Sequence, residues 1–253
     1  MGRARPTGGG AVDPEALWLR PGGSRLGRPP THTRTEITAA AIAVADAEGL
    51  PAVTIRRVAT DIGAGAMSLY SYVPDKETLL ELMIDQASGE DELPPASGDC
   101  HVDLRQLAQT QRAIMRRHPW LPSALAFRQT LGPNTLAAME YALTALADTD
   151  LDSQSKLEVV ALLTGFVANY VAQEVAQERD GRQPQESVAA QVRYLHTVVR
   201  GGDYPRLAEV LSSSSGRAPS SFDRLLDQLI DGLVPERTTS RSSMEVDRTR
   251  SAE

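Results

Sequence analysis

Apolar residues recur along this chain at the spacing of α-helices, and no stretch of useful length alternates as a β-strand does. The regular spacing begins abruptly near position 35. The preceding residues 1–33 are rich in Gly, Pro and Arg and have no period. Such a composition buries too little apolar surface to order the backbone, so residues 1–33 are expected to form a disordered arm. The rest of the chain predicts an all-α fold, with no repeated unit of about 20–50 residues.

Four short helices are predicted in a first domain, residues 34–87. The first helix is expected to end at Gly49, and the second to begin after Thr54, a favourable N-cap residue. A third helix of about two turns covers 65–72. Asp75 is expected to cap the fourth. Three short helices joined by tight turns are typical of a helix-turn-helix, which would span roughly Thr35 to Lys76.

A second helical domain is predicted over residues 100–234, after an acidic segment, 88–99, that contains two adjacent prolines. Its helices are expected at about 104–118, 121–130, 133–146, 153–178, 188–199 and 221–230. One apolar face of the 133–146 helix is expected to hold Leu136, Met139, Leu143 and Leu146. The polar residues 235–253 are expected to form a disordered tail.

The longest predicted helix, 153–178, is apolar on two sides. One side carries Leu157, Val160, Ala161, Thr164 and Val171; the other carries Val159, Leu162, Leu163, Phe166 and Tyr170. A helix that is apolar on both sides must bury both. One side can face the core of its own domain, while the other requires a partner. The pattern therefore favours a homodimer held by a four-helix bundle.

Charge and cysteine content restrict the environment of the chain. The net charge is −7, yet residues 1–34 carry six arginines against Asp13 and Glu15. A basic arm on an acidic body is expected where one end approaches DNA, and a solvated tail without function is the alternative. Cys100 is the only cysteine, which fits a reducing cytoplasm. No apolar run is expected to approach the roughly 20 residues that span a bilayer, and no secretory segment is recognised, so no membrane partner is expected.

The third predicted helix has the composition of a DNA-reading element. Leu69 is expected to point inward, which turns the remaining side chains toward a major groove. Those outward residues are Ala66, Met67, Ser68, Tyr70, Ser71 and Tyr72. Lys76 stands at the start of the next helix, where its ammonium and the helix N-terminus both favour a phosphate. By pattern alone, any small helical bundle is an alternative, and Tyr70 and Tyr72 could be core aromatics.

The residues themselves resemble the TetR (tetracycline repressor) family. The match runs from Thr35 through the ADAEGL of 45–50 and the VTIRRVA of 53–59, and it is most specific in the SLYSYVPDKETLL of 68–80. The HPWL of 118–121 and the GPN of 132–134 are similar to the tetracycline-repressor-type C-terminal domain. The resemblance covers about 50 residues strongly. It implies an N-terminal three-helix DNA-binding domain followed by a helical domain for ligand binding and dimerisation.

The resemblance also implies roles for individual residues. Thr54 matches a capping position that touches phosphate, Arg56 a position that reaches a base or the backbone, and Lys76 the phosphate-binding lysine. The six outward residues above match the recognition helix, and Arg34 lies where the arm would meet DNA. Tyr72 stands where many relatives have His, and Ala66 and Met67 replace polar base readers. The implied function is a repressor that binds palindromic operator DNA as a dimer and is released by a small-molecule effector.

A ligand pocket requires apolar walls and a few polar groups. The candidates for lining it are Met115, Trp120, Phe127, Met139, Phe166, Asn169 and Tyr170, with Gln173 and Arg128 as further polar anchors. Core packing is the alternative for each aromatic residue, and Trp120, next to Pro119, is favoured as a structural plug. The four histidines, His32, His101, His118 and His196, are scattered without a metal-ligand spacing. No metal and no cofactor are therefore expected.

Two other functions remain to be weighed. An all-helical enzyme is disfavoured because no nucleophile–base pair, phosphate-binding glycine loop or paired-carboxylate motif stands out. The second alternative keeps the fold but makes the protein an activator, or a protein-interaction module that no longer reads DNA. The plain side chains of Ala66 and Met67 give this alternative its weight. Salt-dependent operator binding separates the interaction module from a DNA-binding protein, because phosphate contacts release counterions.

Overall fold

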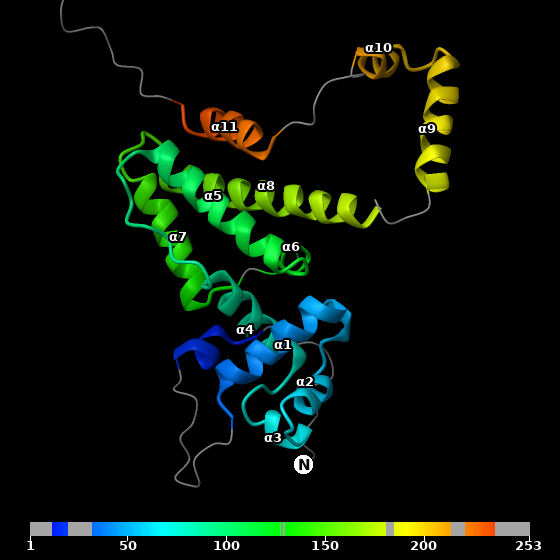
Figure 1. Ribbon diagram of the computed structural model, residues 1–253. Helices are drawn as coiled ribbons and strands as arrows, with labels where there is room; N and C mark the ends of the chain where they lie inside the picture. The colour runs from blue at the N-terminus through cyan, green and yellow to red at the C-terminus, as the bar shows by residue number, and fades with distance from the viewer. Residues whose placement is uncertain are drawn as a thin grey trace, which may run out of the picture.

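The computed structural model describes residues 12–19, 32–126, 128, 130–180, 185–213 and 221–235. Every regular element within these ranges is a helix (Figure 1). In chain order they are η1 (Glu15–Leu19), α1 (Arg34–Glu48), η2 (Leu50–Ala52), α2 (Ile55–Asp61), α3 (Ala66–Leu69), α4 (Lys76–Ser88), α5 (Cys100–Arg117), α6 (Leu121–Leu125), α7 (Pro133–Ala145), α8 (Ser153–Asp180), α9 (Gln185–Arg200), α10 (Pro205–Ser213) and α11 (Phe222–Leu233). The all-α prediction is confirmed.

Helices α1 to α4 form the first domain, and their bounds follow from local capping. Thr33 and Glu36 form a reciprocal capping box at the start of α1, which satisfies backbone N–H groups that the helix leaves free. Thr54 caps α2 and Asp75 caps α4, both as predicted. Gly49, at φ 85°, follows α1 with a backbone conformation that L side chains rarely adopt.

The core of this domain is built from the inward faces of α1 and α4. Ile37 of α1 and Leu79 and Met83 of α4 are fully buried there, together with Leu69 of α3. Leu69 and Val73, on either side of the turn after α3, are each 1% exposed. Burial of a side chain of this size stabilises a fold by about 1.5–3 kcal/mol. These two residues therefore fix α3 and its turn onto the domain.

The second domain packs α5 against α8, α7 and α11, with α6 against α8 and α4 (Figure 1). Its core holds Leu104, Leu107, Leu163 and Leu226, each at most 1% exposed. Arginines on α5 also pair with carboxylates on neighbouring helices: Arg105 with Asp227, Arg112 with Glu174 and Arg116 with Glu178. The apolar contacts dominate the energy, because partly exposed ion pairs contribute little.

Three features of this domain differ from the sequence-based prediction. The helix predicted at 121–130 ends at Leu125, after which Arg128 extends to bind carboxylates on α4. Leu136 is 46% exposed, because the buried residues within α7 are Ala142 and Ala145, whereas Leu146, just after the helix, is fully buried as predicted. Helix α10 was not predicted.

The predicted disordered arm contains a folded turn. Residues 12–19, which lie within the arm, include the short helix η1. Leu17 is 6% exposed and belongs to the core cluster of the first domain, and Trp18 packs partly against it. The carbonyl oxygen of Leu17 accepts a hydrogen bond from Arg34 Nη1 at 3.2 Å. A segment predicted to be disordered thus contributes a buried apolar side chain, Leu17, to the core. The tail predicted at 235–253 lies outside the described residues beyond 235.

Helix α8 requires a correction to the prediction about apolar runs. Within the described residues, Ser153–Glu178 is long and apolar enough to span a membrane by length and composition alone. One side of it, formed by Val159, Leu163, Val167 and Val171, is buried against the second domain. Among the described residues, only 22% of the most apolar window of α8 is buried, so a single chain covers one side of this helix.

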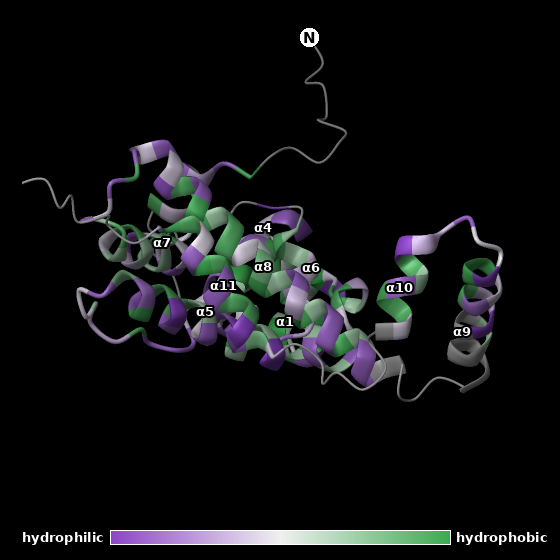
Figure 2. Ribbon diagram, turned by 90° about the horizontal axis from the view of Figure 1, so that it is seen from above, coloured by the Kyte–Doolittle hydropathy of each residue, from purple (hydrophilic) through white to green (hydrophobic). Residues whose placement is uncertain are grey.

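Helices α9 and α10 contact each other and lie apart from the rest of the described helices (Figure 2). Apolar side chains on this pair are exposed, including Tyr194 at 71% and Val210 at 62%. Both helices have apolar and polar positions at helical spacing. The pair contributes little to the core of the second domain.

Candidate nucleic-acid interface

Helices α2 and α3 meet through a tight turn. The side chain of Thr54 accepts a hydrogen bond from the backbone N–H of Arg57 at 3.1 Å, which fixes the first turn of α2. Gly63, at φ 66°, permits the sharp change of direction into α3. Ala64 N–H then donates to the carbonyl of Ala59 at 2.8 Å, which closes the turn. The two helices are thus held as a rigid pair at the free end of the first domain (Figure 1).

The outer face of α3 and its following turn presents four side chains to solvent. Met67 is 83% exposed and Tyr70 is 43% exposed, and Ser68 and Ser71 are exposed beside them. Each serine hydroxyl donates to a backbone carbonyl of its own turn, at 2.6 Å. Oxygen lone pairs of both hydroxyls therefore stay available to a partner.

Two of the six residues predicted to face DNA do not lie on that face. Ala66 and Tyr72 are half-buried and pack against the core cluster. The physical reason is that α3 is only one helical turn long, so the chain bends after Leu69 and turns the ring of Tyr72 back toward the domain. The alternative that this tyrosine serves as a core aromatic is favoured by its burial, whereas Tyr70 is exposed.

Positive charge near α3 comes from residues on α2 and α4. Arg56 is exposed and forms no ion pair with any residue that the structure describes. Arg57, in contrast, is held by Glu48 at 2.7 Å and by Asp61. The hydrogen bonds to Asp61 and Glu48 raise the pKa of Arg57. Lys76 opens α4, and no carboxylate is bonded to it among the described residues. Arg56 and Lys76 are therefore the cations free to meet phosphates.

Arg34 is placed differently from the prediction. Its side chain is half-buried and bonded to the carbonyl of Leu17, so it fastens η1 to the start of α1. A guanidinium with several N–H groups keeps donors after one such bond. The observed role is structural.

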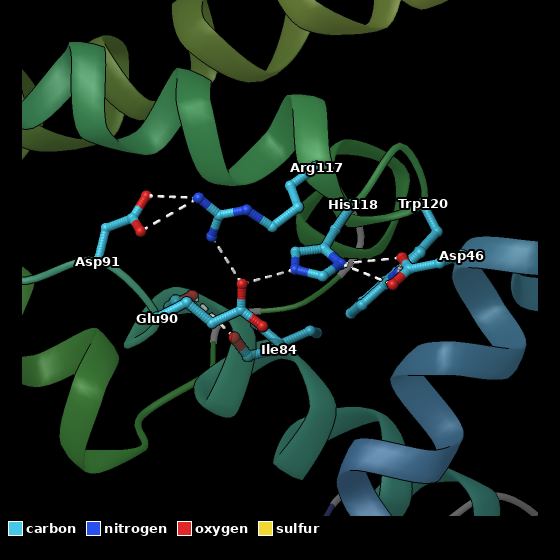
Figure 3. Close-up of polar contacts among 8 residues, drawn as sticks. Asp46, Ile84, Glu90, Asp91, Arg117, His118 and Trp120 are labelled. Carbon is cyan, nitrogen blue, oxygen red and sulfur yellow. Dashed lines mark hydrogen bonds and ion pairs between the residues drawn. The ribbon is translucent and has the colours of Figure 1, made fainter.

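The junction between the two domains contains a polar cluster that sequence reasoning missed (Figure 3). His118, at the C-terminal end of α5, is 3% exposed. Its Nδ1 lies 2.8 Å from Asp46 Oδ1 on α1, and its Nε2 lies 2.9 Å from Glu90 Oε2 after α4. Trp120 Nε1–H also donates to Asp46 Oδ1, at 2.7 Å. The HPWL segment thus joins the second domain to the first.

Helix α4 is fastened to the second domain along one face. Arg128 pairs with Glu77 and lies 3.9 Å from Glu81, while Asp85 binds the first turn of α7. These three carboxylates follow each other at intervals of four residues, which places them on one side of a helix. The sequence shows the spacing of the three carboxylates, but it does not show which residues bind them.

The candidate ligand-lining residues fall into separate groups. Met115 and Trp120 are buried, the latter in the junction with Asp46, which agrees with its role as a structural plug. Phe166 and Tyr170 lie together with Phe222, which stacks on Phe166 at 5.7 Å between ring centroids. The guanidinium of Arg112 lies 4.6 Å from the centre of the Phe222 ring. The three rings therefore pack against one another within the second domain.

The remaining candidates do not join that cluster. Asn169 is exposed, and its Oδ1 accepts a hydrogen bond from Gln173 Nε2 at 2.7 Å. Met139 is half-buried on α7, and Arg128 binds α4. Phe127 lies outside the described residues. Among the described residues, no group of three or more His, Cys, Asp or Glu side chains is arranged to hold a metal ion.

A short α3 braced by α2, with exposed hydroxyl and cationic groups around it, defines a helix-turn-helix regulator fused to a helical domain. The model of bacterial regulatory proteins of the tetR family matches residues 37–83, and the model of the tetracyclin repressor-like C-terminal domain matches 94–236. The chain therefore belongs to the TetR family of transcription regulators.

Similar proteins come from species of Streptomyces and Saccharopolyspora. The chain is 35% identical over 225 residues to the HTH-type transcriptional repressor DrrR1 of Streptomyces coeruleorubidus, covering 87% of this chain and 83% of that protein. It is 31% identical over 223 residues to an HTH-type transcriptional regulator of Saccharopolyspora erythraea, covering 87% and 92%. The solved structure of ActR from Streptomyces coelicolor in complex with actinorhodin has a TM-score of 0.64 and 26% identity, covering 81% and 97%.

Proposed function

We propose that this protein is a dimeric, effector-responsive repressor that binds a palindromic operator in the cytoplasm through α2 and α3. The observation that carries the proposal is the exposed surface of α3 and its following turn, formed by Met67, Ser68, Tyr70 and Ser71. The neighbouring helices add Arg56 and Lys76, which form no ion pair with any residue that the structure describes. Hydroxyl and ammonium groups suit phosphates, and an apolar side chain such as methionine suits a thymine methyl.

The outer face of α8 supports the dimer. Leu157 and Leu162 are 44% and 53% exposed, and the small residues Ala161, Gly165 and Ala172 lie exposed beside them. Only 22% of the most apolar window of this helix is buried within one chain. A second copy of the same helix would cover this stripe, because small residues allow two helices to approach closely. Two recognition helices would then face two half-sites.

The effector is proposed to be a hydrophobic compound with several fused rings. Phe166, Tyr170 and Phe222 offer aromatic faces within the second domain, and Arg112 offers a cation beside them. The structure of ActR in complex with actinorhodin, at 26% identity to this chain, supports the proposal of a ligand. Binding would release DNA if the effector has higher affinity for a state with differently placed recognition helices.

Operator binding tests the proposal. Purified full-length protein is titrated against duplexes from upstream of its own and neighbouring genes, at two salt concentrations. We expect a specific complex that weakens with salt, and Lys76→Gln should reduce the slope of log Kobs against log salt by about 0.9. Tyr70→Ala should weaken specific binding by about fivefold or more.

The matched control is Tyr194→Ala, which removes a tyrosine that is 71% exposed on α9, outside the first domain. This variant should bind the operator as the wild type does. A folded protein that shifts none of these duplexes at low salt would contradict the proposal and favour a protein-interaction module instead.

A further inference from the structure

His118 is bonded on both ring nitrogens to carboxylates that belong to different parts of the chain. Nδ1 faces Asp46 of α1 at 2.8 Å, and Nε2 faces Glu90, beyond the end of α4, at 2.9 Å (Figure 3). A neutral imidazole carries only one N–H, so it can donate to only one of the two. The protonated ring donates to both. The observed geometry is that of an imidazolium between two carboxylates.

The hydrogen bonds and ion pairs among the described residues define the charges around the ring. The charged groups bonded to His118 are Asp46 and Glu90, and Glu90 also accepts from Arg117 Nη1 at 2.8 Å. Arg117 in turn holds Asp91. Trp120, on the far side, donates to Asp46 without adding charge. Loss of the His118 proton would leave a ring lone pair against a carboxylate oxygen in a site that is 3% exposed.

Asp46 connects this cluster to the DNA-binding helices. It lies in the last turn of α1, and Glu48, two residues further on, binds Arg57 of α2 at 2.7 Å. Helix α2 is fixed to α3 by the turn at Gly63. The contacts of His118 thus lead through Asp46, the last turn of α1 and the Glu48–Arg57 ion pair to the helices proposed to meet DNA.

We propose that protonated His118 is the positioning residue that holds the DNA-binding helices in one orientation on the second domain, so that operator affinity falls when the ring loses its proton. This inference rests on the proposed function. The bridge between α1, α5 and the segment after α4 is complete only in the imidazolium form. Without the bridge, α1 gains conformational freedom that operator binding must remove. The free energy needed to remove it lowers the affinity for the operator.

The expected direction with pH follows from the same contacts. Burial alone would lower the pKa of His118, but the hydrogen bonds to Glu90 and Asp46 outweigh it and raise the pKa above the ordinary value. Burial alone would raise the pKa of Glu90, but its hydrogen bonds with His118 and Arg117 hold the pKa below the ordinary value. The bridge is therefore complete below the raised pKa of His118 and is lost as pH rises through it.

Operator affinity is measured by fluorescence anisotropy at constant ionic strength from about pH 6 to pH 9. We expect wild-type affinity to fall about fivefold or more across the His118 titration. His118→Gln should bind more weakly and show no such transition. The control His101→Gln changes a histidine at the other end of α5, whose Nε2 lies 3.5 Å from Asp231 on α11, and it should keep the wild-type profile. A wild-type profile in His118→Gln would overturn the inference.

A second measurement is made without DNA. The chain has two tryptophans, and the indole N–H resonance of Trp120 reports its hydrogen bond to Asp46. The chemical shift of this resonance should change with pH in the free protein, with the same midpoint as the affinity profile. The Trp18 resonance serves as the reference. Asp46→Asn keeps the volume and removes the charge, so it should move this midpoint to lower pH. If the Trp120 chemical shift does not change with pH, or if its midpoint is unchanged in Asp46→Asn, the His118 bridge is disproved even if operator binding is confirmed. If the protein binds no operator at any pH, the proposed function fails. The pH dependence of the Trp120 chemical shift then tests the His118 bridge by itself.

Discussion

Asp85 on α4 caps the first turn of α7: its Oδ1 accepts the backbone N–H of Asn134 at 3.0 Å. The same oxygen accepts the N–H of Thr135 at 3.0 Å, and the amide of Asn134 donates to Oδ2 at 3.1 Å. Asp85 is 3% exposed. A side chain from the connecting helix α4 thus supplies the N-terminal cap of α7, 49 residues further along the chain. The two domains share this contact.

Asp85→Ala should lower the free energy of unfolding by about 2–4 kcal/mol, because it leaves two N–H groups in the partly buried first turn of α7 without their carboxylate acceptor. Asp85→Asn retains one carbonyl oxygen and should cost less. Urea unfolding followed by circular dichroism measures both variants. Equal stability of the alanine variant and the wild type would show that water replaces the carboxylate.

Gly132 allows this contact because it has no side chain. A Cβ at position 132 would overlap the carboxylate of Asp85, although the backbone conformation there is an ordinary one. Gly132→Ala should therefore destabilise the protein by about 1–3 kcal/mol. The matched control is Gly232→Ala on α11, where a Cβ meets nothing within 4 Å. That substitution should be neutral or stabilise by up to about 1 kcal/mol. Equal effects of the two substitutions would contradict the steric explanation.

The acid limit of stability should depend on Asp103. Burial alone would raise the pKa of this carboxyl, but hydrogen bonds from Ser97 and Gly98 outweigh it and hold the pKa below its ordinary value. A carboxyl with a lowered folded-state pKa stabilises the protein above its unfolded-state pKa, and this contribution is lost as pH falls through the folded-state value. Asp103→Asn should be less stable than the wild type at pH 7.

The difference between these two proteins should shrink as the pH is lowered from about 5 toward 3, because the wild-type carboxyl then becomes neutral as well. Thermal unfolding of both proteins across this range measures it. A difference that stays constant with pH would show that packing around Asp103, rather than its charge, is responsible.

Local contacts explain which parts of the fold the sequence predicted. Thr54 and Asp75 cap helices that begin at the next residue, and Gly49 follows the helix that it ends, so each boundary is encoded within a few residues. The third helix, predicted from its pattern over 65–72, is present but is only one turn long. The exposure of Tyr70 but not Tyr72 depended on how far α3 extends, which its sequence does not specify.

The junction between the domains could not be predicted in this manner. Asp46 and His118 are 72 residues apart, and each looked like an ordinary polar residue at a helix end. Only the folded arrangement of α1 and α5 brings them together. Likewise, the exposure of Leu136 follows from the close approach of α7 through Ala142 and Ala145, which a hydrophobic pattern along one helix does not reveal.

The proposed dimer makes the last prediction. Leu162 is 53% exposed on the apolar stripe of α8, where a second copy would bury it. Leu162→Glu would place a carboxylate in that apolar contact, and burying an unpaired charge is unfavourable by several kcal/mol. We expect sedimentation velocity to show a dimer for the wild type and a monomer for this variant, with loss of operator binding. The matched control is Leu136→Glu, a substitution of a leucine that is 46% exposed on α7, away from the stripe. It should remain dimeric and bind the operator. If both variants remain dimers, the subunits associate through a surface other than the outer face of α8.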